Sequence, residues 1–169
     1  MIGSLSGIRG ILNMDMTVAD VSRFATNFAW ATGSKEFLLA RDSRRTGPAM
    51  CKAVAAALTS TGATVRDYGV VSTPAIFRES RTRGVPAVMV TASHNEPEFN
   101  GLKFIQQGAG IGEETFGSVL GGPRAKERKF GRGSVKAAPK PSYVEDLVAR
   151  FGEGSCEGVR VAVSRSSGS

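Results

Sequence analysis

The fold is decided by a stretch that runs from Val85 to Phe104 and reads V-P-A-V-M-V-T-A-S-H-N-E-P-E-F-N-G-L-K-F. Its first six residues form a short apolar run, which is typical of a buried strand. Ser93 follows this predicted strand closely, and open α/β sheets bind their ligands just beyond the carboxyl ends of their strands. The chain's only histidine, His94, two asparagines and Lys103 come soon after. The stretch therefore predicts a polar site at the end of a strand.

Alternating helix and strand patterns surround this stretch. Thr17 and Asp20 have the spacing of a capping box, and apolar residues then recur at helical spacing. The other predicted elements are strands at 37–40, 64–68 and 102–105 and helices at 48–60 and 75–82. This alternation predicts an α/β fold, a three-layer αβα domain with a largely parallel mixed sheet between helices. It also predicts that the loops at Arg41, Ser72 and Ser93 meet at one edge of the sheet.

The carboxyl-terminal part of the chain gives weaker patterns. Gly108–Gly112 reads G-A-G-I-G and is interpreted as a turn, because it lacks the final glycine of a nucleotide-binding loop. Ser142 and Glu145 have the spacing of a second capping box, for a helix that reaches Phe151. Val159–Val163 then has the pattern of a fresh strand, which predicts that a second α/β unit begins there.

The composition predicts one globular domain. With 169 residues, 41% of them hydrophobic and 22% charged, the chain can bury a sizeable core. No run approaches the roughly 20 apolar residues that span a bilayer, and the amino terminus lacks the pattern of a secretory signal. We therefore expect a cytoplasmic protein without a membrane partner. Cys51 and Cys156 have neither metal-ligand nor disulfide spacing, so both are predicted to be free thiols.

Positive charge is concentrated in one segment. The formal net charge is +7, and Gly121–Pro141 holds seven basic residues against one acidic residue. Glycine and proline punctuate this segment, which predicts a solvated loop or linker. A basic module that binds nucleic acid is the weaker interpretation, because Phe130 is the one aromatic residue in the run and offers no interleaved stacking platform.

Four segments resemble, in order along the chain, the motifs of one enzyme family. They read S-G-I-R-G at Ser6–Gly10, A-R-D-S-R at Ala40–Arg44, G-V-V-S-T-P-A at Gly69–Ala75, and T-A-S-H-N at Thr91–Asn95 with N-G-L-K after it. They are similar to the T-S-G-x-R-G, G-R-D-x-R, G-x-x-x-T-P, and T-A-S-H-N-P with N-G-x-K motifs of the α-D-phosphohexomutases. Glu96 replaces the usual proline and Leu5 the usual threonine. The resemblance covers nearly the whole chain but concerns only the first of the family's four domains.

The resemblance implies chemical roles for three residues. Ser93 corresponds to the serine that carries a phosphate, donates it to a sugar monophosphate, and takes back the other phosphate of the bisphosphate intermediate. His94 and Lys103 correspond to candidates for the proton transfers that accompany these steps. Two other roles remain open: Lys103 can instead clamp a phosphate, and His94 can instead cap the loop with a hydrogen bond.

Cations must converge on such a phosphate, because phosphoryl transfer depends mainly on alignment and on neutralising charge. The resemblance implies Mg²⁺, bound to this chain by Ser93 through its phosphate and otherwise by carboxylates of a later domain. Arg9 is the candidate second cation, with a surface salt bridge as the alternative. Ser6 and Asn95 are candidates for phosphate binding. The two arginines of A-R-D-S-R, Arg41 and Arg44, either face the site or pair with Asp42 to brace their loop.

The implied function is that of a phosphohexomutase, which moves phosphate between the 1- and 6-positions of a hexose. A hexose phosphate is then the substrate, with glucosamine, mannose and glucose all open, and a hexose bisphosphate is the intermediate. Residues 1–152 correspond to the phosphoserine-bearing domain and residues 153–169 to the start of a second domain. We expect this fragment to be inactive without the remaining mutase domains. A catalytically incomplete phosphosugar-binding fragment is the main alternative.

Overall fold

The computed structural model describes residues 1–122, 129–152 and 154–162. The strands are β1 (Ile2–Ser4), β2 (Gly7–Ile11), β3 (Glu36–Arg41), β4 (Thr64–Val70), β5 (Ala87–Val90), β6 (Phe99–Gln106), β7 (Ala109–Gly110) and β8 (Ser134–Ala137). The helices are α1 (Val18–Thr32), α2 (Gly47–Ser60), α3 (Thr73–Arg83), α4 (Glu113–Gly121) and α5 (Tyr143–Phe151). Every helix and strand predicted between residues 17 and 105 is present.

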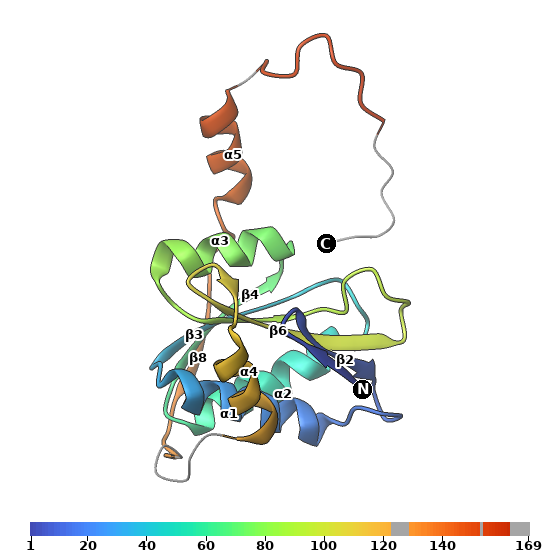
Figure 1. Cartoon of the computed structure of the whole chain (residues 1–169). Helices are drawn as coiled ribbons and strands as arrows, with labels where there is room; N and C mark the ends of the chain where they lie inside the picture. The colour runs from blue at the N-terminus through green and yellow to red at the C-terminus, as the bar shows by residue number, and fades with distance from the viewer. Residues whose placement is uncertain (123–128, 153, 163–169) are drawn as a thin grey trace.

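The strands form one mixed sheet between two layers of helices. Its order is β1-β2-β6-β5-β3-β4-β8, and β7 pairs with β6. β3 is parallel to β4 and β5, and β8 is parallel to β4, whereas β6 is antiparallel to both β5 and β2. Figure 1 shows α3 on one face of the sheet and α1, α2 and α4 on the other. The predicted three-layer α/β fold is therefore confirmed.

Side chains that alternate along the central strands build a core on each face of the sheet. On β5, Val90 joins the core under α1, α2 and α4, whereas Met89 joins the core under α3. In the larger core the ring of Phe28 lies 5.8 Å from that of Phe37 and 4.9 Å from that of Phe104. Because β5 is buried on both faces, its sequence is a continuous apolar run rather than an alternating one.

The helix α1 begins at the predicted capping box. The Asp20 N–H donates to Thr17 Oγ1 at 3.1 Å, and the Thr17 N–H donates to Asp20 Oδ2 at 3.0 Å. The Thr17 hydroxyl also donates to Asp20 Oδ2 at 2.7 Å. This bond, followed by the one from the Thr17 N–H, holds the pKa of Asp20 below its usual range. Gly33 ends the helix with φ at 63°, a conformation that glycine adopts without strain.

The basic segment 121–141 is not wholly the solvated linker that the sequence predicts. Ser134–Ala137 forms β8, which extends the sheet beside β4. All four residues of β8 are exposed, so no apolar alternation marks the strand in the sequence. Before it, the Phe130 ring packs edge-on against Trp30 at 5.2 Å, and Trp30 Nε1 donates to the Lys129 carbonyl at 2.8 Å. The basic residues between 123 and 128 lie outside the described residues.

Other elements also differ from the sequence-based predictions. The strands β1 and β2 and the helix α4 were not predicted, because their short, glycine-containing sequences show little periodicity. The segment Gly108–Gly112 holds β7 as well as a turn. Ser142 forms no capping box, and its hydroxyl instead donates to Asp146 Oδ2 at 3.0 Å. Residues 159–162 form no strand, and Val163 lies outside the described residues.

The helix α5 stands beyond α3, away from the sheet (Figure 1). Arg78 of α3 donates to Asp146 Oδ2 at 2.8 Å, and Tyr143 packs against the smaller core. These contacts attach the first turn of α5 to α3, while no residue of α5 is buried. Of the helices in the described parts of the chain, none is both long enough and apolar enough to cross a membrane.

Candidate active site

The carboxyl ends of three parallel strands meet at one edge of the sheet, as predicted. Arg41 at the end of β3 pairs with Val70 of β4 and with Val90 of β5, so the three strands end level with one another. The loops that follow them leave from the same edge. The loop between β5 and β6, residues 91–98, carries Ser93 and is called the serine loop below.

Ser93 has a left-handed backbone conformation, with φ at 59°. This conformation costs a residue other than glycine about 1–3 kcal/mol, so the surrounding structure must stabilise it. The Ser93 N–H donates to Thr91 Oγ1 at 2.9 Å, and Thr91 is itself buried. The Ser93 side chain is exposed, which leaves its hydroxyl open to a substrate.

His94 lies beside the Ser93 hydroxyl. The distance from Ser93 Oγ to His94 Nδ1 is 3.4 Å, which is long for a hydrogen bond between oxygen and nitrogen. The histidine side chain is exposed and is placed where it could exchange a proton with Ser93 or simply hold the loop. The geometry fits both of the roles that the sequence leaves open.

Arg44, in the loop after β3, holds the serine loop from one side. Its Nη1 donates to the carbonyl oxygens of Glu96 and Phe99 at 2.6 and 3.0 Å. Its Nη2 donates to those of Ser93 and Asn95 at 3.0 and 2.7 Å. The A-R-D-S-R segment drew attention to this arginine, but the sequence did not indicate that it reaches the serine loop.

The predicted brace between the A-R-D-S-R arginines and Asp42 is confirmed for one of them. Arg44 Nε lies 3.2 Å from Asp42 Oδ2, and both side chains are largely buried. Arg41 does not form an ion pair with this carboxylate. Its Nη1 donates instead to the main-chain oxygen of Asp42 at 3.0 Å, and its stem lies against Gly47. Asp42 thus orients Arg44 toward the serine loop.

Arg9 holds the serine loop from the other side. Its Nη1 donates to Asn95 Oδ1 at 3.2 Å. Its stem crosses Gly101 of β6, where an added Cβ would lie 2.6 Å from the Ile8 carbonyl oxygen and 2.8 Å from that of Thr91. The glycine of the N-G-L-K motif is therefore required by a close approach of three backbone segments. Within the described ranges Arg9 forms no salt bridge, so the alternative role of Arg9 as a partner in a surface salt bridge is not supported.

Lys103 lies on the same face of the sheet as Arg9. In β6 it is opposite Met89 of β5, and on its other side its stem lies beside Gly7 of β2. Among the residues that the structure describes, it has no hydrogen-bonding or ion-pair partner, and its side chain is half-buried. Its ammonium group is therefore available to a phosphate or to a proton-transfer step near Arg9.

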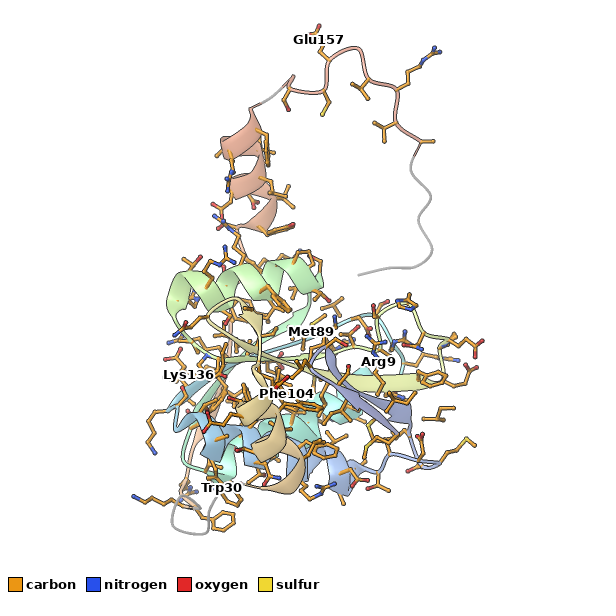
Figure 2. All side chains as sticks on the ribbon, viewed as in Figure 1. Arg9, Trp30, Met89, Phe104, Lys136 and Glu157 are labelled. Carbon is orange, nitrogen blue, oxygen red and sulfur yellow. The ribbon has the colours of Figure 1, made fainter. Side chains whose placement is uncertain are left out.

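The remaining predicted residues are less closely grouped. Asn95 joins the site through Arg9, but Ser6 lies in the turn between β1 and β2, where its hydroxyl is 2.8 Å from that of Ser4. No contact within the described parts of the chain links Ser6 to Ser93. Figure 2 shows Arg9 and Lys136 toward opposite edges of the sheet, and four strands separate β2 from the exposed strand β8. The site is therefore not next to β8.

The described residues contain no group of three His, Cys, Asp or Glu side chains that could hold a metal ion. A phosphate on Ser93 would supply the oxygen donors that Mg²⁺ prefers, but only as one part of a coordination shell. The described side chains therefore do not form a complete site for Mg²⁺ by themselves.

Known proteins resemble this chain in sequence and in fold. A family model described as "Phosphoglucomutase/phosphomannomutase, alpha/beta/alpha domain I" matches residues 4–119. The phosphoglucosamine mutase of Kineococcus radiotolerans is 34% identical, over 96% of this chain and 40% of that protein. The phosphoglucosamine mutase of Thermosipho africanus is 36% identical, over 60% of this chain and 24% of its own length.

A solved structure of a phosphoglucomutase/phosphomannomutase family protein from Burkholderia thailandensis shares the fold. Its TM-score is 0.72 at 24% sequence identity, over 90% of this chain and 36% of that chain. The chain thus spans 40%, 24% and 36% of the lengths of these three relatives, in the order given. On the family match over residues 4–119, the chain belongs to the phosphoglucomutase/phosphomannomutase family, of which it carries the α/β/α domain I.

Proposed function

We propose that this chain is the phosphoserine-bearing part of a phosphohexomutase that works in the cytoplasm. The activity is transfer of a phosphate between the 1- and 6-positions of a hexose phosphate through Ser93. Phosphoglucosamine is the first substrate to test, because the curated relatives carry the name phosphoglucosamine mutase. Glucose and mannose phosphates remain candidates, since the family name covers both.

One observation carries the proposal: the exposed hydroxyl of a serine with a strained backbone lies at the ends of three parallel strands, in a loop that two arginines hold. Arg44 and Arg9 hold the serine loop from opposite sides, and Lys103 is available on the same face as Arg9. Strained residues cluster at functional sites, and catalysis of phosphoryl transfer needs fixed alignment and positive charge. Asn13 and Gln107 also have positive φ, at 66° and 51°, so the strain at Ser93 supports the proposal only together with the exposed hydroxyl and the nearby cations.

The proposed reaction forms and breaks one phosphorus–oxygen bond in each step. A sugar hydroxyl attacks the phosphorus of phospho-Ser93, the bond to Ser93 Oγ breaks, and a hexose bisphosphate results. The sugar hydroxyl loses its proton to a base, and Ser93 Oγ receives a proton from an acid; His94 and Lys103 are the candidates. Transfer of the other phosphate back to Ser93 Oγ reverses these roles. Bound Mg²⁺ would neutralise charge on the phosphate.

Phosphate mapping by mass spectrometry tests the proposal. A chimera that joins residues 1–152 to the remaining domains of the Kineococcus relative is incubated with glucosamine or glucose 1,6-bisphosphate and Mg²⁺, and the modified residue is identified. We expect phosphate on Ser93 and none on the Ser93→Ala variant. Stable phosphate elsewhere, with Ser93 unmodified, would overturn the assignment.

An incomplete phosphosugar-binding fragment is the second candidate, and the partial coverage of the relatives favours it. The two candidates differ in turnover once the rest of the enzyme is present. We therefore propose to join residues 1–152 to the remaining domains of the Kineococcus relative. A mutase domain should give a chimera with turnover, whereas the chain alone should stay far below about 1 per second. A folded chimera that binds sugar phosphate without turnover would favour the binding fragment.

A further inference from the structure

The guanidinium of Arg44 is fully used by the protein itself. An arginine side chain carries five N–H donors. In this structure Nε donates to Asp42 Oδ2, Nη1 donates to two carbonyl oxygens, and Nη2 donates to two more. Only 13% of the side chain is exposed. No donor is left for a substrate phosphate, so Arg44 differs from Arg9 and Lys103 in what it can do.

Three of the four carbonyl oxygens belong to the serine loop, those of Ser93, Asn95 and Glu96, and the fourth belongs to Phe99, the first residue of β6. Among the described residues, two other backbone bonds lie inside the loop, from Asn95 N to the Ala92 oxygen and from Phe99 N to the Glu96 oxygen. Each of these closes a single turn and does not attach the loop to the sheet. Two contacts with β6 also attach the loop: the Thr91 N–H donates to the Gly101 oxygen at 2.9 Å, and Asn100 Nδ2 donates to the Glu98 carbonyl at 3.1 Å. Arg44 ties the carbonyls of Ser93, Asn95 and Glu96 to the loop after β3.

The contact with Ser93 has a direct consequence for its backbone. The Ser93 N–H donates to Thr91 Oγ1, and the Ser93 carbonyl oxygen accepts a hydrogen bond from Arg44 Nη2. The peptide groups on both sides of Ser93 are thereby fixed, which selects the left-handed conformation at φ 59°. The direction of the Ser93 side chain follows from that conformation, because Cβ is attached to the same Cα.

We infer that Arg44 is a positioning residue for phosphoryl transfer at Ser93: it fixes the serine loop through main-chain carbonyls and does not bind the phosphate. This inference rests on the proposed function of Ser93. A lysine at position 44 keeps the charge but has three donors on one nitrogen, so it cannot reproduce a planar fork that serves four carbonyls and a carboxylate. Arg44→Lys is therefore the informative substitution.

The neighbouring arginine provides a matched control. Arg45 is exposed, and no hydrogen bond or ion pair of Arg45 occurs within the described ranges. Arg45→Lys makes the same chemical change one residue away. Asp42→Asn is a milder second variant, because it weakens the anchor of Nε and leaves Arg44 in place. Circular dichroism establishes that each variant is folded.

Two measurements test the inference: hydrogen exchange on the 169-residue chain, and phosphorylation of Ser93 in the chimera of residues 1–152 with the remaining domains of the Kineococcus relative. Hydrogen exchange should be about tenfold or more faster in peptides covering residues 91–99 of Arg44→Lys, less so in Asp42→Asn, and unchanged in Arg45→Lys. The maximal rate of Ser93 phosphorylation by hexose 1,6-bisphosphate should fall about tenfold or more in Arg44→Lys, without a change in the bisphosphate concentration at half-maximal rate.

The outcomes separate this inference from the proposed function. The inference on Arg44 is overturned if hydrogen exchange in residues 91–99 is unchanged in a folded Arg44→Lys variant. It is also overturned if exchange there is faster but the rate of Ser93 phosphorylation is unaltered. A raised half-maximal concentration at an unchanged maximal rate would make Arg44 a ligand for the substrate, against the inference. If the folded wild-type chimera accepts no phosphate on Ser93, the proposed function of Ser93 fails, while exchange alone still decides whether Arg44 holds the loop.

Discussion

The guanidinium of Arg9 donates a hydrogen bond of 3.2 Å to the side-chain oxygen of Asn95, and so joins β2 to the serine loop across 86 residues of sequence. The two residues come from the first and last of the four motif segments. Their contact depends on β6, which pairs with β2 and follows the serine loop directly. The antiparallel β2–β6–β5 arrangement is thus what brings Arg9 to the site.

The Arg9–Asn95 bond should be measurable as a coupling energy. We expect Arg9→Ala and Asn95→Ala to be non-additive in the free energy of unfolding, by about 0.5–1.5 kcal/mol, since either substitution alone removes the same bond. Urea unfolding of the two single variants and the double variant measures this. Arg23→Ala combined with Asn95→Ala should be additive. An additive Arg9–Asn95 pair would show that the bond contributes nothing to stability.

Substitution of Lys103 distinguishes its two proposed roles. Lys103→Ala should lower the rate of Ser93 phosphorylation by about 10² to 10⁴-fold if the lysine takes part in proton transfer. Lys103→Arg keeps the charge but cannot release a proton near neutral pH, so an equal loss in that variant supports proton transfer. Near-full activity of Lys103→Arg would instead identify a phosphate clamp. Lys52→Ala, on the exposed face of α2, is the control, and an unaffected Lys103→Ala would remove this lysine from the mechanism.

Local patterns were sufficient to predict most of the fold and the position of Ser93 just beyond the end of a strand. The apolar run before Thr91 predicted β5, and the polar residues after it placed Ser93 at a strand end. The capping box at Thr17 and Asp20 predicted the start of α1 to the residue. Each of these signals lies within a few neighbouring residues, which is why a single sequence reveals it.

The contacts of Arg44 could not be predicted in this way. Its four acceptors in the serine loop and at the start of β6 are main-chain carbonyl oxygens, which every residue type has. The residue types of the loop therefore give no sign of the contact. The strand β8 was missed for a related reason: a strand at the edge of a sheet with all of its side chains exposed needs no apolar alternation.

Gly101 and Gly117 should respond to alanine in opposite directions. A Cβ at Gly101 would lie 2.6 and 2.8 Å from two backbone oxygens, which cannot move without opening the sheet. We expect Gly101→Ala to destabilise the fold by about 1–3 kcal/mol. Gly117, inside α4, has open space around it, and alanine there should stabilise by about 0.5–1 kcal/mol. Chemical denaturation measures both, and a neutral Gly101→Ala would contradict the close approach of β2, β6 and Thr91.

Removing the cap of α1 should have an effect that depends on pH. Thr17→Ala should cost about 1 kcal/mol near neutral pH, because it removes the side-chain bond to the Asp20 N–H. The Thr17 hydroxyl also lowers the pKa of Asp20, so the folded state favours the carboxylate. The contribution of this carboxylate to the free energy of unfolding is complete above the usual pKa of about 3.9. It is lost as the pH falls through the lowered pKa of Asp20 in the folded state.

The difference between wild type and Thr17→Ala should therefore narrow below about pH 4, when urea unfolding is followed at a series of pH values. Ser72→Ala is the matched control, because Ser72 precedes α3 without a capping bond from its side chain. Its effect should stay within about 0.5 kcal/mol at every pH. A difference for Thr17→Ala that does not change with pH would show that Asp20 takes no part in the cap.

The two cysteines should react with thiol reagents at very different rates. Both are free thiols in the structure, as predicted, with Cys51 buried and Cys156 exposed. Burial raises the pKa of Cys51 to about 12, and because the thiolate is the reacting form, it should be inert at pH 8 in the folded chain. A chromogenic disulfide should then titrate one thiol in native protein and two in urea. Cys156→Ser should titrate none until it unfolds, whereas Cys51→Ser should titrate one at once. Rapid reaction of native Cys156→Ser would mean that α2 opens readily, and would contradict the packing of Cys51 against the larger core.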